Sequence, residues 1–268
     1  MKRIKISIIL PCFKRMDYLN YTLWSLYQQK ISYDLETIVL NDYLSNSKAE
    51  EICNKYQDKL NIKYIFTGQR NRRKKIIQRD QGFVLNIGVK QSDGDIIILT
   101  GNGLFHLNNT IDSVVKPLII DKKILSTEKY IFFDNGTIVN HLSKNLTQTL
   151  PKNLFSIPIS KYWGLIEYAY TLPFFMGMYK KEFIDIGGHD EDFIGMAGLD
   201  DDLIHRLKVN GLKFHYCNAK IVHLYHSKSI PIGINRWNSS KWIYNTFLRF
   251  TRQDIIVRNT DKEWGIIE

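Results

Sequence analysis

Short runs of branched apolar residues alternate with amphipathic segments along the first hundred residues of the chain. The runs are continuous, which is typical of strands that are buried on both faces of a parallel sheet. The segments between them place apolar residues at helical spacing, as Leu19, Leu23 and Leu26 do. The predicted strands are Lys5–Leu10, Leu35–Leu40, Ile62–Phe66 and Asp95–Leu99, and the predicted helices are Tyr18–Gln29, Ala49–Leu60 and Gly82–Gln91. This alternation predicts an α/β fold with a doubly wound, mostly parallel sheet, because each parallel crossover needs a helix to return the chain.

The second half of the chain is less regular. The pattern predicts short strands and turns over Lys122–Asn145, strands at Pro173–Tyr179, Phe214–Cys217 and Ile221–Leu224, and helices over Lys180–Ile186 and from the aspartates at 200–202 to about Gly211. From Pro231 onward, aromatic residues among basic ones predict a C-terminal helix. We expect one domain over residues 1–230 and an extension over 231–268 that packs on it, with a membrane surface as the alternative partner for its aromatic side chains.

Three polar segments follow strands of the predicted sheet: Pro11–Phe13, Asn41-Asp42 and Thr100–Gly103. Ligands of doubly wound sheets bind at the carboxyl ends of the strands. We therefore expect these three segments to surround one crevice.

The stretch from Gly187 to Leu207 has a different character. A glycine pair, an acidic turn and a glycine-rich loop lead into three consecutive aspartates, Asp200 to Asp202, at the start of an amphipathic helix. Aspartate at a helix start can cap free backbone N–H groups and complement the helix dipole. One cap would suffice, however, and three adjacent carboxylates repel one another, so the stretch also predicts a catalytic carboxylate.

The net charge of the 268-residue chain is +10, and five of its positive charges lie between residues 69 and 75. Such a run fits nucleic acid, anionic lipid, the phosphates of a small ligand or a solvated loop. No nucleic-acid-binding signature accompanies it, so we do not expect nucleic acid as a partner. No apolar run reaches a membrane-spanning length, the N-terminus lacks a signal-peptide pattern, and the three cysteines are widely spaced. We expect a cytoplasmic protein without disulfides or zinc, with peripheral membrane contact as an open alternative.

Several segments resemble inverting GT-A glycosyltransferases of the family 2 type, which have a Rossmann-like sheet. Ser7–Arg15 resembles their opening strand and nucleotide loop, and Ile38–Asp42 resembles their second strand. Gln78–Phe83 and Asn86–Gly88 are similar to elements of the chondroitin-polymerase branch, and residues 187–206 are similar to the C-terminal galactosyltransferase motif. Together these segments span about residues 5–226, in the order that the family has.

The resemblance implies transfer of a sugar from a nucleotide sugar, a UDP-sugar, to a glycan or glycolipid acceptor with inversion. Asp200 matches the catalytic aspartate and is expected to be the general base. The expected nucleotide-binding residues are Pro11, Cys12, Phe13, Asp42, Arg79, Asp80 and Asn102. The expected acceptor-binding residues are Trp163, Asp190, Met196 and Asp201. Met196 and Leu199 replace the Trp and Glu of the motif, so the acceptor of the family does not carry over.

The chain departs from the family at the expected metal site. The family ends its fourth strand with Asp-x-Asp, which holds Mn²⁺ or Mg²⁺, whereas this chain has Thr100-Gly101-Asn102-Gly103. Asn102, His223 and His226 are the candidate ligands. Cations of the segment Arg70–Lys75, or Arg79, are alternative partners for the leaving diphosphate. Weak metal use, metal-free catalysis and an inactive nucleotide-sugar or glycan-binding subunit of a larger synthase stay open at this point.

Overall fold

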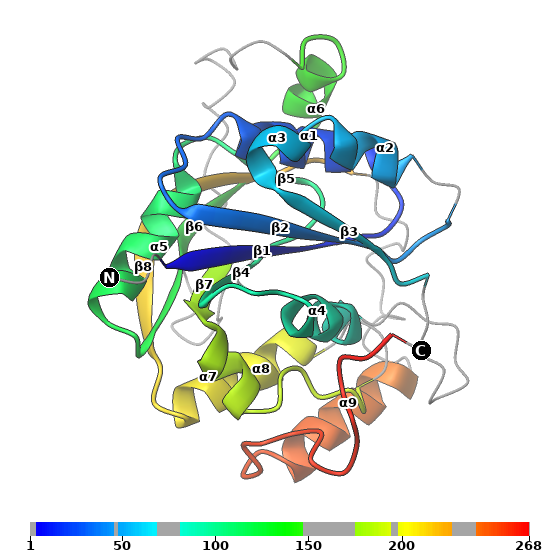
Figure 1. Cartoon of the computed structure of the whole chain (residues 1–268). Helices are drawn as coiled ribbons and strands as arrows, with labels where there is room; N and C mark the ends of the chain where they lie inside the picture. The colour runs from blue at the N-terminus through cyan, green and yellow to red at the C-terminus, as the bar shows by residue number, and fades with distance from the viewer. Residues whose placement is uncertain are drawn as a thin grey trace.

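The computed structural model describes residues 4–45, 48–68, 81–146, 175–193, 198–226 and 240–267. Their strands form one eight-stranded sheet in the order β3-β2-β1-β4-β7-β6-β8-β5 (Figure 1). The strands are β1 Lys5–Cys12, β2 Asp34–Asn41, β3 Ile62–Phe66, β4 Ile96–Leu99, β5 Leu104–His106, β6 Ile124–Phe133, β7 Met176–Tyr179 and β8 Lys213–His223. β3, β2, β1 and β4 are parallel, whereas β7 runs antiparallel to both β4 and β6. The predicted α/β class with a mostly parallel sheet is confirmed.

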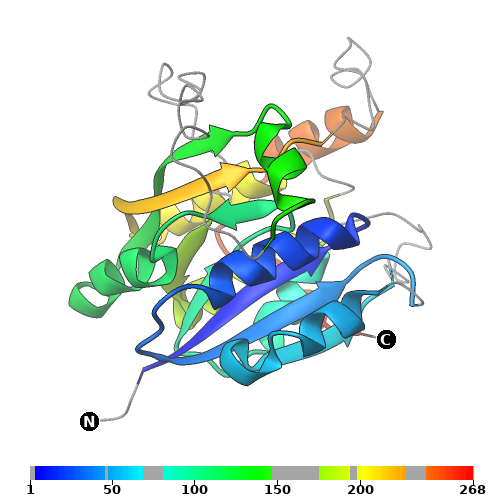
Figure 2. The same cartoon turned by 90° about the horizontal axis from the view of Figure 1, so that it is seen from above.

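Helices cover both faces of this sheet. They are α1 Met16–Tyr27, α2 Ala49–Asn54, α3 Gln57–Leu60, α4 Gln81–Lys90, α5 Thr110–Ile120, α6 Thr137–Leu142, α7 Lys180–Asp185, α8 Leu199–Val209 and α9 Ser240–Thr251. α1, α2 and α3 lie on one face, and α4, α7 and α8 lie on the other (Figure 1). Viewed from above, α1 runs along β1 (Figure 2). Within the described part of the chain, no helix combines the length and the hydropathy needed to cross a bilayer.

The continuous apolar runs supply two separate cores. Ile6, Ile8 and Leu10 of β1 pack with α1, α2 and α5, whereas Ile9 packs on the opposite side with α4, α7 and α8. Successive side chains of a strand point to opposite faces, so a strand covered on both faces is mostly apolar. The buried hydroxyl of Ser7 in β1 is satisfied by a hydrogen bond to Glu36. The mostly apolar pattern explains why the strands of the parallel half were predictable from composition alone.

β1 continues through Pro11, where the sequence pattern predicts its end. In a parallel strand, alternate residues bond to opposite neighbours. Cys12 accepts a hydrogen bond from the Asp42 N–H on the β2 side, and Ile9 accepts one from Thr100 on the β4 side. Pro11 therefore faces the β4 side, beyond the last paired residue of β4, and its missing N–H costs no ladder hydrogen bond.

Two other expectations differ from the structure. The helix predicted over Ala49–Leu60 is split into α2 and α3, and the turn between them places the Tyr56 hydroxyl on Asn20 Oδ1 at 2.8 Å. The two strands predicted within 214–224 are one continuous strand, β8, and residues 124–133 form the long strand β6. These two strands pair along most of their length, which accounts for their extent.

The C-terminal segment passes over the turn that follows α7. The Arg258 N–H donates to Ile186 O at 3.0 Å, and its carbonyl oxygen lies 2.1 Å from where a Cβ on Gly187 would be. Gly187 also has a φ of +74°, so both conformation and space require glycine there. Asn259 Nδ2 donates to Gly187 O and His189 O at 2.8 and 2.7 Å. The predicted boundary at residue 230 lies outside the described residues and stays a prediction.

A buried ion network fastens this segment to α8. The Arg258 guanidinium pairs with Asp190 at 2.9 Å and with Asp202 at 3.0 Å. The other oxygen of Asp202 accepts from Arg206 Nε at 2.7 Å, and Arg206 is fully buried. Buried charges persist only when each is paired and hydrogen-bonded. The network therefore ties the C-terminal segment to the acidic turn and to the first turn of α8.

We expect Arg258→Met to lower the free energy of unfolding by about 3–5 kcal/mol, because it leaves two buried carboxylates short of a cation. The matched control is Lys116→Met, which removes an exposed partner of Asp112 and should cost no more than about 1 kcal/mol. Urea denaturation followed by circular dichroism measures both changes. Equal losses in the two variants would contradict the role given to Arg258.

Candidate active site

The ends of three parallel strands bring together the residues predicted to bind a nucleotide. The Asp42 N–H donates to Cys12 O at 2.8 Å, and Asp42 Oδ1 accepts from the Thr67 hydroxyl at 2.8 Å. Asn102 Nδ2 lies 3.3 Å from Cys12 Sγ. The register of β1 with β2, which pairs Cys12 with Asn41, makes these contacts possible. The three segments predicted from the strand ends therefore lie together at one edge of the sheet, and the crevice between them stays a prediction.

The loop between β1 and α1 is strained and held by Asn102. Lys14 and Arg15 both have left-handed backbone conformations, with φ of 57° and 52°. Non-glycine residues rarely adopt this conformation, and the surrounding structure must hold it in place. Asn102 Nδ2 donates to the carbonyl oxygens of Lys14 and Arg15 at 3.2 and 3.3 Å. Both cationic side chains are thereby exposed at the end of β1.

An aromatic pair lies at the same end of the sheet. The rings of Phe13 and Tyr43 meet edge to face with centroids 5.4 Å apart. The Lys14 ammonium lies 5.3 Å from the Phe13 centroid and 5.7 Å from that of Tyr43. This group offers an aromatic surface beside a positive charge. Pro11, near the end of β1, is buried.

The histidines predicted as metal ligands lie near Asn102. The Leu224 N–H donates to Gly103 O at 2.8 Å, which joins the end of β8 to the loop after β4. The rings of His223 and His226 have centroids 5.1 Å apart. Burial, with smaller contributions from His226 and Arg15, lowers the pKa of His223 to about 4. His223 is therefore neutral at physiological pH.

These side chains do not fit a divalent cation site. The donors are one amide and two imidazoles, and the Arg15 guanidinium is close enough to lower the pKa of His223. Mg²⁺ and Mn²⁺ prefer carboxylate and carbonyl oxygens. Over the described ranges, no group of three or more histidine, cysteine, aspartate or glutamate side chains could hold a metal ion. Asn102 Oδ1 is buried and accepts no hydrogen bond within these ranges, but one neutral oxygen does not make a site for either ion.

The three consecutive aspartates have three different environments. Asp202 is buried in the ion network, and Asp201 pairs with Arg249 at 3.3 Å. Asp200 forms no ion pair within the described residues. Asp200 is partly buried, and desolvation, together with the charge of Asp201, raises its pKa to about 6. Asp200 is thus the aspartate with a carboxylate suited to accept a proton near neutral pH.

α8 begins beside the start of α4. A Cβ on Gly82 would lie 3.1 Å from Leu199 and 2.9 Å from His189. Asn86, one turn further along α4, exchanges hydrogen bonds with the His189 backbone at 2.9 Å in each direction. His189 itself is buried with its pKa lowered to about 3, so it serves the packing of this turn. The start of α8 is fixed by α4 on one side and by the C-terminal segment on the other.

The remaining predicted residues divide into two groups. Asp190 is buried and pairs with Arg252 and Arg258, which gives it a structural role here; its contact with an acceptor stays a prediction. The same holds for Asp201. Arg79, Asp80, Trp163, Met196 and the segment Arg70–Lys75 lie outside the described residues. The roles of Arg258 and of the strained Lys14-Arg15 pair were not predicted from the sequence. The one local signal was the Gly187-Gly188 pair, because glycine allows the backbone of Arg258 to approach Gly187 closely.

Two protein-family models match the chain. Residues 7–181 match the family model Glycosyl transferase family 2, and residues 146–228 match a model described as N-terminal domain of galactosyltransferase. A curated relative from Methanococcus voltae is dolichyl N-acetyl-alpha-D-glucosaminyl phosphate 3-beta-D-2,3-diacetamido-2,3-dideoxy-beta-D-glucuronosyltransferase. It is 26% identical over 186 residues, which cover 67% of this chain and 54% of the relative. Chondroitin synthase from Pasteurella multocida is 26% identical over 63% of this chain but only 18% of its own length.

Solved structures share the fold at low sequence identity. GalNAc-T7 with UDP, GalNAc and Mn²⁺ has a TM-score of 0.63 at 13% identity, covering 93% of this chain and 48% of that one. TarS from S. aureus in complex with UDP has a TM-score of 0.55 at 16% identity, covering 83% and 61%. The chain spans about half of the archaeal relative and about a fifth of the chondroitin synthase. Because the family model matches well over half of the chain, the protein belongs to glycosyl transferase family 2.

Proposed function

We propose that this domain transfers a sugar from a UDP-sugar to a hydroxyl group of a glycan or glycolipid, with inversion at the anomeric carbon. Membership of the family supports the transferase chemistry. The solved neighbours that contain UDP support the donor. The archaeal relative and the chondroitin synthase, by their names, support a lipid-linked or polysaccharide acceptor.

The donor nucleotide is assigned to the strand ends. Phe13 and Tyr43 offer an aromatic surface for the base, and aromatic side chains stack on nucleobases of any type. The carboxylate of Asp42 lies at the end of β2 beside Cys12, where it would accept from the uracil or ribose. Arg79 and Asp80 are further nucleotide contacts proposed from the resemblance alone.

The general base is assigned to Asp200, and the observation that carries this proposal is the contrast with its neighbours. Asp201 and Asp202 are paired with arginines, whereas Asp200 has a raised pKa of about 6. In the proposed step the acceptor oxygen attacks the anomeric carbon as its proton passes to Asp200. The bond from that carbon to the diphosphate oxygen breaks, and the oxygen leaves with the electron pair.

The departing diphosphate needs positive charge nearby. We assign this charge to two cationic side chains of the β1–α1 loop rather than to a metal ion. Lys14 and Arg15 are exposed at the end of β1, on the loop that Asn102 holds. Charge-assisted hydrogen bonds from such groups stabilise phosphate oxygens as charge develops. The GalNAc-T7 structure contains Mn²⁺, but the donor set at Asn102, His223 and His226 lacks the carboxylates that such an ion requires.

We expect Asp200→Asn to lower the transfer rate by about 100-fold or more while UDP still binds, because the amide cannot accept the proton. Asp185→Asn on α7, which removes a surface carboxylate paired with Lys181, is the control and should retain most of the activity. Turnover of a radiolabelled donor onto an acceptor panel, with calorimetric titration of UDP, separates the two effects. Full activity in Asp200→Asn would exclude it as the base.

The pH dependence provides an independent test of the same residue. A base is active only when deprotonated, so kcat/KM should be level above about pH 6 and fall about tenfold per unit below it. The raised pKa places this fall well above the usual range of an aspartate. A profile that stays level down to pH 5 would contradict the assignment.

Because Asn102, His223 and His226 do not fit a site for Mg²⁺ or Mn²⁺, we expect the sugar transfer to proceed without a metal ion. We expect turnover to persist in excess chelator, and Arg15→Gln to reduce the transfer rate without a gain from added Mn²⁺. The measurement is donor turnover across nucleotide sugars, with chelator and with Mn²⁺. Loss of turnover in chelator, with recovery on Mn²⁺, would overturn the metal-free step. UDP binding without any turnover would favour the second candidate, a nucleotide-sugar-binding subunit, which the missing carboxylates motivate.

A further inference from the structure

One side of α9 exposes a stripe of large apolar side chains. Ile243, Phe247 and Phe250 are spaced four and three residues apart, which places them on the same side of the helix. Their exposed fractions are 56%, 62% and 73%. Leu248 on the other side is buried, so α9 is already packed on the domain and the stripe is a second apolar surface.

Further exposed apolar residues lie close to the stripe in the sequence. Tyr244, Ile255 and Val257 are also exposed, so this short segment holds a large share of the exposed large hydrophobic residues of the described chain. Scattered apolar residues are normal on a protein surface, but a contiguous aromatic patch marks an interaction site. The patch therefore needs a partner with an apolar layer.

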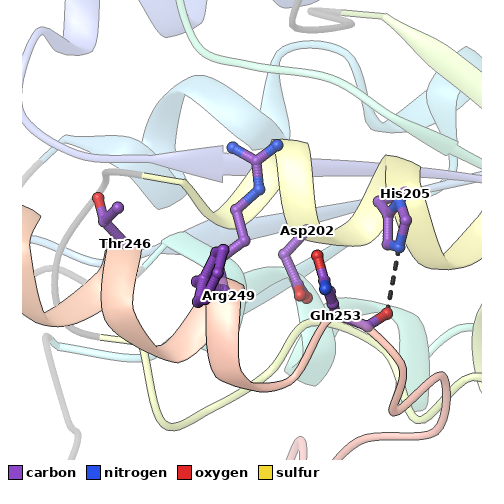
Figure 3. Close-up of a pocket in the computed structure, with 6 residues that line it drawn as sticks. Asp202, His205, Thr246, Arg249 and Gln253 are labelled. Carbon is purple, nitrogen blue, oxygen red and sulfur yellow. Dashed lines mark hydrogen bonds between the residues drawn. The ribbon is translucent and has the colours of Figure 1, made fainter.

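A groove borders this stripe and carries polar groups. It lies between α8 and α9, has a volume of about 260 Å³, and shares Phe250 with the stripe. Figure 3 shows Thr246, Arg249 and Gln253 facing Asp202 and His205 across it. His205 Nε2 lies 3.2 Å from Gln253 O, and Arg249 pairs with Asp201 at 3.3 Å while about half exposed. An apolar stripe beside hydrogen-bond donors matches the boundary between acyl chains and headgroups.

The charge of α9 favours an anionic lipid surface over a second copy of the chain. The helix carries Lys241 and Arg249 but no aspartate or glutamate, in a chain of net charge +10. In a two-fold contact through α9, the same helix of the second copy would offer these cations no carboxylate partner. An anionic lipid surface attracts these cations and accepts the aromatic stripe at the same time.

We propose that α9 binds the surface of an anionic phospholipid membrane. Ile243, Phe247 and Phe250 lie at the acyl boundary, and a headgroup phosphate enters the groove beside Arg249. This proposal stands without the proposed sugar transfer, because its evidence is the exposed face of α9 and the groove alone.

The test is co-sedimentation of the chain with vesicles of phosphatidylglycerol and phosphatidylcholine, and with phosphatidylcholine alone. We expect binding to the anionic vesicles that weakens with salt, and a loss of about tenfold or more in Phe247→Ser/Phe250→Ser. The matched control is Ile119→Ser/Ile120→Ser on α5, which removes two other exposed apolar side chains, 44% and 86% exposed, and should bind as the original chain does. Arg249→Gln should weaken binding to the anionic vesicles and leave the phosphatidylcholine result unchanged.

Light scattering on a sizing column completes the design, with circular dichroism to show that each variant is folded. Failure of the original chain to bind anionic vesicles overturns the proposal. So does an equal loss in the α5 variant. If the original chain does not bind vesicles but forms a dimer, and the dimer dissociates in Phe247→Ser/Phe250→Ser, the stripe is a contact with a second copy instead. If the double variant is unfolded, the single variant Phe250→Ser replaces it in the same vesicle-binding and sizing measurements, because Phe250 is the most exposed residue of the stripe.

Discussion

The position of Asp200 depends on two arginines buried among carboxylates. Arg206 and Arg258 share Asp202, and Arg258 also reaches Asp190. Buried charges of this kind tolerate little displacement, because each loses its partner when the geometry changes. The first turn of α8 is thus held by the C-terminal segment. The charge of Asp202 is used in this network, whereas the pKa of Asp200 is raised by desolvation and by the charge of Asp201.

A second constraint acts at the other side of the sheet. The register of β1 with β2 and β4 brings Cys12, Asp42 and Asn102 to one edge. The amide hydrogens of Asn102 hold the loop that carries Lys14 and Arg15. An aspartate at this position could not donate to those two carbonyl oxygens. In the proposed transfer, the cations of this loop would supply the positive charge that a bound ion supplies in the metal-dependent alternative.

The parallel half of the sheet was predictable because its signal is local. A strand such as β1, covered on both faces, is apolar at nearly every position, and a helix such as α1 repeats its apolar residues along one side. β5, three residues long, carries too little pattern, and β8 alternates polar and apolar residues around Asn218, so it was predicted as two strands. The ion network was out of reach for a different reason. Arg258 and Asp202 lie 56 residues apart in the chain, and only the fold brings them together.

α9, which carries the apolar stripe, is also joined by side-chain contacts to α8, which carries the proposed base. Arg249 pairs with Asp201, the residue next to Asp200. One turn further along α8, His205 contacts the backbone oxygen of Gln253, which lies two residues after the end of α9. A membrane that holds α9 would therefore hold α8 at a fixed depth beside it. A lipid-linked acceptor diffuses in two dimensions and presents its hydroxyl group near the headgroups. For such an acceptor, membrane binding through α9 would also orient the proposed base on α8 toward the acceptor hydroxyl group. This orientation lowers the entropic cost of the reaction, which a single carboxylate cannot do by its basicity alone.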